Sequence, residues 1–80
     1  MTFHEAYNKS TSWKRKITLV SLFHKTRLTK NKKWTIKLTA RYFNASVGLI
    51  SENLKLSNEW ERIKECKSRN EALIKLRNHD

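Results

Sequence analysis

Proline is absent from this chain of 80 residues, and glycine occurs only once, at Gly48. Proline and glycine are the residues that most often interrupt helices, so long stretches of this chain can be helical. Apolar residues recur at helical spacing in several segments, and most of these segments follow a Ser or Thr that can cap a helix. We therefore expect an all-α fold, a small helical bundle of four or five short helices in one domain over residues 1–80.

The first clear helical signal follows two candidate capping residues. A helix that begins at Ser10 or Ser12 would carry an apolar stripe of Trp13, Ile17, Val20 and Phe23. The segment 17–20 would also suit a strand, because it contains β-branched residues. The polar and strongly basic segment 29–33 is expected to connect this helix to the next one.

The two ends of the chain give different signals. Residues 1–9 are expected to form a weakly ordered leader, in which Phe3 and Tyr7 could pair across a single helical turn. Residues 68–78 are expected to form a C-terminal helix. Its signals are a capping box formed by Ser68 and Glu71 and an apolar stripe of Ala72, Leu73 and Leu76.

Two short helices separated by a tight turn are expected over residues 34–56. Thr35 should cap the first helix, and Trp34 can close over its start. The first helix should end at Asn44, because Asn tolerates the left-handed conformation found at helix ends. Ser46 should then cap the second helix.

This arrangement predicts a helix-turn-helix. Such a motif needs a small residue where the helices cross, a residue tolerant of positive φ four positions later, and buried apolar residues around the turn. The residues that meet these needs are the expected motif core: Ala40, Phe43, Asn44, Ala45, Ile50 and Leu54.

The charge of the chain is concentrated in its first half. The chain contains 18 Lys and Arg against 7 Asp and Glu, a formal net charge of +11. No acidic residue occurs between Glu5 and Glu52, so nearly all of the excess lies before the second helix of the predicted motif. A long acid-free basic stretch favours a polyanionic partner such as nucleic acid.

Residues 38–56 resemble the helix-turn-helix of bacterial and phage DNA-binding proteins, in particular the ParB/KorB type in its stand-alone phage or plasmid form. Residues 40–54 are also similar to the headpiece helices of lac-repressor-type regulators. The residues that carry the resemblance are Trp34, Ala40, Ala45, Ser46, Ile50, Ser51, Leu54 and Leu56. Two positions depart from the usual pattern: Asn44 replaces the common Gly of the turn, and Asn53 replaces a frequent apolar residue, so Leu54 should take over its packing.

The resemblance implies a double-stranded DNA partner, with the second helix in the major groove and the first across the backbone. The residues expected to face base edges are Val47, Gly48, Ser51, Glu52 and Lys55. The residues expected to contact phosphates are Lys32, Lys33, Thr35, Lys37, Arg41 and Ser46. A small phage or plasmid transcriptional regulator is the function that this arrangement favours.

Other classes of function find little support in the sequence. Cys66 is the single cysteine, expected to be a semi-exposed helical thiol, so an intramolecular disulfide is excluded. No apolar run is long enough to cross a bilayer and no signal peptide begins the chain, so we expect a cytoplasmic protein without a membrane partner, in a bacterial host cell if phage-encoded. The histidines His4, His24 and His79 are scattered, and a glycine-rich loop is absent, so we expect no enzyme activity, no cofactor and no metal site.

Several features have a second interpretation. The same basic face could serve a small adaptor or inhibitor that binds an acidic surface of a host polymerase or nuclease. A homodimer is possible through the C-terminal helix, where Leu73, Ile74 and Leu76 offer more apolar surface than one face needs. Trp13, Trp34 and Trp60 could stack on single-stranded bases, but their helical spacing favours packing in the core.

Overall fold

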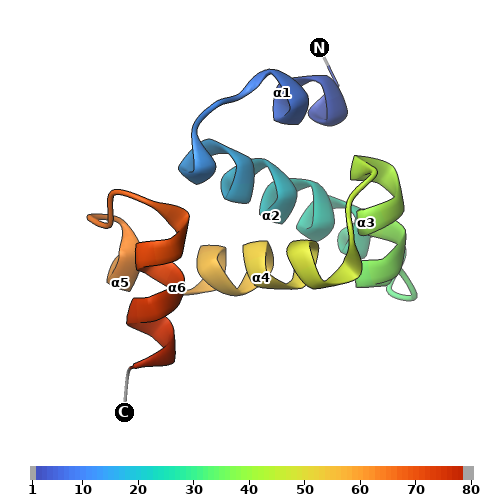
Figure 1. Ribbon diagram of the computed structural model, residues 1–80. Helices are drawn as coiled ribbons and strands as arrows, with labels where there is room; N and C mark the ends of the chain where they lie inside the picture. The colour runs from blue at the N-terminus through green and yellow to red at the C-terminus, as the bar shows by residue number, and fades with distance from the viewer. Residues whose placement is uncertain (1, 79–80) are drawn as a thin grey trace.

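Six α-helices make up most of residues 2–78, the part of the chain that the computed structural model describes (Figure 1). The helices are α1 (Phe3–Lys9), α2 (Trp13–Lys30), α3 (Ile36–Phe43), α4 (Val47–Asn58), α5 (Trp60–Ile63) and α6 (Arg69–Arg77). No strand occurs within this range, which confirms the all-α prediction there and excludes a strand over residues 17–20. The described bundle has six helices, and not four or five, because α1 and α5 are additional short helices.

The helices α2 and α4 lie side by side through the middle of the molecule (Figure 1). One hydrophobic cluster, which we call the aromatic cluster, joins α2 to α3 and α4 through Val20, Phe23, Ala40, Phe43 and Ile50. A second, the C-terminal cluster, joins α2 and α4 to the last part of the chain through Ile17, Leu56, Ile63, Cys66 and Ala72. Because α2 contributes to both clusters, it holds the two ends of the bundle together.

The N-terminal segment is a helix, and the expectation of a weakly ordered leader is wrong. Thr2 caps α1 in a complete capping box, since its hydroxyl accepts from the backbone N–H of Glu5 and the Glu5 carboxylate accepts from the Thr2 backbone N–H. The ring of Phe3 lies 5.6 Å from that of Phe23, and the ring of Tyr7 lies 5.0 Å from that of Phe43. These aromatic contacts partly bury one face of α1 and hold this short helix against the bundle.

The helix α2 is longer than the sequence indicated. It begins after Ser12, whose hydroxyl accepts from the backbone N–H of Arg15, and it continues to Lys30. The connector therefore spans residues 31–35 and not 29–33. The last turn includes Thr29, whose hydroxyl donates to the Lys25 carbonyl, so the polar residues there are compatible with helix.

The single cysteine is not a semi-exposed helical thiol. Cys66 lies between α5 and α6 with only 4% of its surface exposed, and it packs in the C-terminal cluster beside Ile63 and Ala72. The segment between the two helices therefore folds back onto the core. Ser68 then caps α6 by accepting from the backbone N–H of Glu71, as the sequence predicted.

The turn between α3 and α4 has the conformation that the sequence predicted. Asn44 adopts left-handed φ and ψ angles of 55° and 47°, and it is the one non-glycine residue with positive φ in the described range. The next amide, that of Ala45, donates to the Ala40 carbonyl at 2.9 Å and closes the end of α3. Ser46 then accepts from the Leu49 backbone N–H at 3.1 Å, so α4 begins at once.

We expect the backbone of Asn44 to decide the effect of substitutions there. Asn44→Gly should retain the stability of the fold, whereas Asn44→Val should lose about 1–2 kcal/mol relative to the glycine variant, because a Cβ is disfavoured in the left-handed region. Urea unfolding measures the difference. Asn70→Val is the matched control, since Asn70 is an exposed Asn within the right-handed helix α6. Each valine variant is compared with the glycine variant at the same position. Equal losses of stability at Asn44 and Asn70 would contradict the conclusion that the left-handed backbone of Asn44 causes the loss.

A buried polar group lies between α2 and α3. The Nδ1 atom of His24 lies 2.6 Å from the hydroxyl oxygen of Thr39, and the indole N–H of Trp34 donates to the same oxygen at 2.7 Å. An indole N–H can only donate, so the Thr39 oxygen is the acceptor in its contact with Trp34. The hydroxyl hydrogen of Thr39 can then donate to Nδ1 of a neutral His24 ring. Burial lowers the pKa of His24 below its usual value of 6.5, so the fold favours the neutral imidazole.

The His24 environment predicts that acid destabilises the fold. A histidine whose pKa is lower in the folded state contributes stability that is complete above the unfolded pKa, near 6.5, and is lost as the pH falls below it. The urea midpoint should therefore decrease between about pH 7.5 and pH 5. In His24→Gln the midpoint should start lower, because the packing changes, and should depend less on pH over this range. An equal pH dependence in both proteins would exclude His24 as its source.

Candidate nucleic-acid interface

The helix α4 has one packed face and one exposed face. Ile50, Asn53 and Leu56 point into the bundle, and each has at most 3% of its surface exposed. The five predicted base-facing residues are all exposed and follow the helical period: Val47, Gly48, Ser51, Glu52 and Lys55. Figure 1 shows α2 along one side of α4, with no helix below the middle of α4 in that view. The structure therefore brings the five residues together on one open face.

Most of the predicted motif core lies where the sequence placed it, with one correction. Ala40, Phe43 and Ile50 are buried in the aromatic cluster, where Ala45 and Leu54 are partly buried against it. Asn44 is exposed, as its place in the turn requires. Leu54 does not replace Asn53 in packing, because Asn53 is itself buried, with 3% of its surface exposed. The polar residue keeps the inward position because its side-chain oxygen has a partner, Arg69, described below.

The predicted phosphate-contacting residues are exposed and lie around α3. They are Lys32 and Lys33 in the connector, Thr35 and Ser46 at the starts of α3 and α4, and Lys37 and Arg41 on α3. Lys37 and Arg41 are separated by one helical turn, so they share the outer face of α3. The hydroxyls of Thr35 and Ser46 accept from backbone amides as caps, which leaves their hydrogens available to donate.

Three cations of α2, Lys14, Lys16 and Arg27, contact groups within the bundle. The Lys14 ammonium donates to the Lys64 carbonyl at 2.6 Å, and the Lys16 ammonium lies 5.0 Å above the Tyr7 ring. The Arg27 guanidinium lies 5.0 Å from the Phe23 ring and 5.5 Å from the Trp34 ring. Part of the positive charge of α2 therefore stabilises contacts within the bundle.

The three tryptophans are partly buried and pack against the two hydrophobic clusters. Trp34 borders the aromatic cluster, whereas Trp13 and Trp60 border the C-terminal cluster. The indole N–H of Trp13 donates to the Lys67 carbonyl at 3.2 Å, which fixes the ring against the turn before α6. The three side chains therefore pack against the core, as their spacing indicated, although none of them is fully buried.

One set of contacts on α4 was not expected from the sequence. Arg69, the first residue of α6, donates from Nη2 to the Glu52 carboxylate at 2.7 Å and from Nε to the Asn53 side-chain oxygen at 3.2 Å. Glu52 belongs to the exposed face of α4 and Asn53 to its packed face. No local pattern could have revealed this cluster, because Arg69 lies 17 residues after Glu52.

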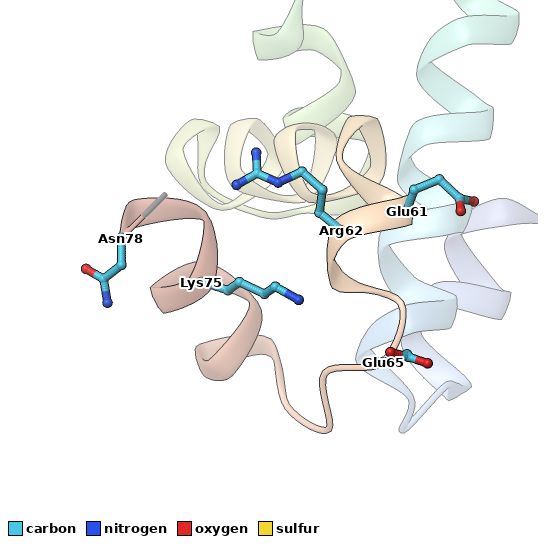
Figure 2. Close-up of a pocket in the computed structure, with 5 residues that line it drawn as sticks. All are labelled: Glu61, Arg62, Glu65, Lys75 and Asn78. Carbon is cyan, nitrogen blue, oxygen red and sulfur yellow. The ribbon is translucent and has the colours of Figure 1, made fainter. Parts of the chain in front are cut away.

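The groove between α5 and α6 is lined by none of the predicted site residues. The groove in Figure 2 has a volume of about 450 Å³, lies between α5 and α6 and carries mixed charge, with Glu61, Arg62, Glu65, Lys75 and Asn78 as its lining. Among residues 2–78, no three His, Cys, Asp or Glu side chains lie close enough to hold a metal ion. His79 lies outside that range. In the same range, every helix is too short or too polar to span a bilayer.

Comparison of the chain with protein-family models, curated proteins and solved structures gives no significant match.

Gly48 has no packing role within the chain. A Cβ atom built at this position meets no other atom within 4 Å, and the backbone there does not have positive φ. Neither steric conflict nor backbone conformation requires a glycine in the first turn of α4. Gly48 is therefore either a tolerated residue without a role or a position that allows another molecule to approach the α4 backbone closely.

Gly48→Ala should therefore stabilise the isolated protein and weaken binding at the exposed face of α4. We expect a gain of about 0.5–1 kcal/mol in the free energy of unfolding, because Ala favours helix. If the exposed face of α4 binds DNA as the sequence predicts, the affinity for a random-sequence duplex at low salt should decrease, because the added methyl group holds the backbone away. Urea unfolding and fluorescence anisotropy measure the two effects. A more stable variant with unchanged affinity would show that Gly48 is merely tolerated.

Proposed function

We propose that this protein binds double-stranded DNA, with α4 in the major groove and α3 across the backbone, as a small phage or plasmid transcriptional regulator would. The observation that carries the proposal is the exposed face of α4. The turn at Asn44 and the packing of Ile50 and Leu56 leave this face uncovered beside a basic helix. An exposed helix next to a second helix with outward cations is the arrangement by which helix-turn-helix proteins dock on DNA.

The electrostatics support a phosphate-dominated mode of binding. The connector before α3 and the outer face of α3 carry Lys32, Lys33, Lys37 and Arg41, all of them exposed. Cations of this kind position a protein on the backbone without reading sequence. The proposed activity is binding alone and requires neither a cofactor nor a catalytic step.

The exposed face of α4 offers modest means of base selection. Val47, with 48% of its surface exposed, can contact a thymine methyl group, and the Ser51 hydroxyl can bond to several base edges. The first turn of α4 contains neither Arg nor Asn, which make the strongest two-point contacts with guanine and adenine. We therefore expect strong general affinity for DNA and limited discrimination between sequences.

Dimerisation would allow two half-sites to be read together. Within α6, Leu73 and Leu76 pack against the C-terminal cluster, whereas Ile74 keeps 52% of its surface exposed. A homodimer through α6 would therefore use Ile74 in particular. Light scattering of the free protein and of its complex with a duplex determines the stoichiometry.

We expect the affinity for duplex DNA to depend steeply on salt. If about six phosphates are neutralised, the affinity should decrease by roughly 10³-fold between 50 and 200 mM salt. In the variant Lys37→Ala/Arg41→Ala, affinity should decrease for all sequences alike, and the slope of log affinity against log salt should become smaller by about 1 for each phosphate that is no longer neutralised. Fluorescence anisotropy with a labelled random-sequence duplex measures both quantities.

The matched control is Lys67→Ala/Lys75→Ala, which removes the same charge at exposed positions of the C-terminal part of the chain. It should change the affinity and the salt slope much less than the α3 variant does. Equal effects of the two variants would mean that net charge, and not the α3 surface, drives binding. Failure of the unmodified protein to bind any duplex at low salt would exclude the proposal and favour the alternative, a small adaptor or inhibitor that uses this face on an acidic protein surface.

A further inference from the structure

The contacts of Arg69 distinguish it from the other cations of the C-terminal half. The ion pairs Arg62–Glu59 and Lys64–Glu61 join residues three apart, as neighbours on a helix surface commonly do. Arg69 instead pairs with Glu52 of another helix and also donates to Asn53. Its side chain has 27% of its surface exposed, so water screens this pair less than a fully exposed one.

The two contacts fix the orientation of the Arg69 guanidinium. Its Nε–H is held by a buried oxygen of Asn53, and its Nη2 is thereby directed at Glu52, 2.7 Å away. The planar fork of an arginine can satisfy both acceptors at once, whereas the single ammonium of a lysine cannot reproduce this geometry. The buried Asn53 thus acts as an anchor for a charge that reaches the exposed face of α4.

A carboxylate on a DNA-facing surface needs such support. Phosphates repel Glu52, so a freely rotating side chain would turn away from the groove. The Arg69 guanidinium supplies the opposite charge and holds one carboxylate oxygen, Oε1, in place. Half of the Glu52 side chain remains exposed, and an ionised carboxylate keeps further acceptor positions. The held carboxylate can therefore accept a hydrogen bond from outside.

We infer that Arg69 is a positioning residue for base recognition, which holds Glu52 so that its carboxylate accepts a hydrogen bond from the exocyclic amino group of a cytosine in the major groove. Among the base edges there, the cytosine amino group is the donor that a carboxylate characteristically selects. The inference rests on the proposed binding of duplex DNA by α4. Through Arg69, α6 then takes part in selecting the DNA sequence, although it lies outside the helix pair α3 and α4.

The test measures base preference as well as affinity. Selection from a random duplex pool first defines the site preferred by the unmodified protein. The affinity for every single-base-pair change in that site is then measured for the unmodified protein and for the variants Glu52→Ala, Arg69→Ala and Arg69→Lys. Thermal unfolding followed by circular dichroism verifies that each variant folds, and Arg69→Lys provides a milder change if Arg69→Ala does not fold.

We expect one C·G base pair whose replacement weakens binding of the unmodified protein by about 5-fold or more. Glu52→Ala and both Arg69 variants should lose the preference at that same base pair and retain it elsewhere. The double variant Glu52→Ala/Arg69→Ala should lose no base preference beyond what Glu52→Ala alone loses, since Arg69 acts through Glu52. Arg62→Ala, which removes a local ion pair on α5, is the matched control and should retain the preference.

Three outcomes would overturn the inference. If Arg69→Ala and Arg69→Lys keep the cytosine preference, Arg69 does not position Glu52. If Arg69→Ala instead weakens binding to all sequences equally, Arg69 contacts a phosphate. If the unmodified protein binds duplex DNA without base preference, Glu52 makes no base-selecting contact, although the proposed DNA binding stands. Absence of any duplex binding would be a separate result that overturns the proposed function together with the inference.

Discussion

The left-handed conformation of Asn44 is the constraint on which the arrangement of α3 and α4 depends. One residue with positive φ ends α3 and turns the chain, and Ser46 caps α4 two residues later. The short turn brings Ala40 and Phe43 into the same cluster as Ile50. Burial of that side of α4 leaves the opposite side exposed. The open face of α4 is the side that these contacts do not cover.

The packing of α2 explains why the helix pair α3 and α4 does not have to be stable by itself. Short helices are marginal in water, and most of their stability comes from tertiary contacts. Phe23 stacks on Tyr42 with ring centroids 4.1 Å apart and meets Phe43 edge-on at 5.2 Å. Ile17, six residues before Phe23 on the same helix, packs in the C-terminal cluster. Through these contacts α2 supports α3 at one end and the segment around α5 and α6 at the other.

The basic charge of the chain serves two physical purposes. On α2, the cations of Lys16 and Arg27 lie over aromatic rings and contribute to packing. Around α3, Lys37 and Arg41 point away from the bundle, where they raise the positive potential beside the exposed face of α4. A count of charges in the sequence could not separate these groups, because the difference depends on which side chains have an aromatic neighbour in space.

Local features of the fold could be predicted from the sequence, because they depend on residues within about four positions of one another. The caps at Ser12, Thr35, Ser46 and Ser68, the end of α3 at Asn44 and the all-α class are of this kind. The five positions of α4 expected to face outward came from the resemblance to helix-turn-helix proteins, and the structure places all five at exposed positions of that helix. The role of α1 was missed, because its order comes from rings far along the chain and its own sequence gives only a short signal.

Tertiary structure alone decided the features that join distant parts of the chain. Cys66 is buried because α5 and α6 fold back on Ile17, and Asn53 can remain inside because Arg69 reaches it. The same arginine turns Glu52 from an isolated surface acid into half of an ion pair. The sequence by itself determined where helices begin, end and turn, since those choices are governed by short-range sterics and hydrogen bonds. Which polar groups become partners depended on how the helices pack, which no local pattern encodes.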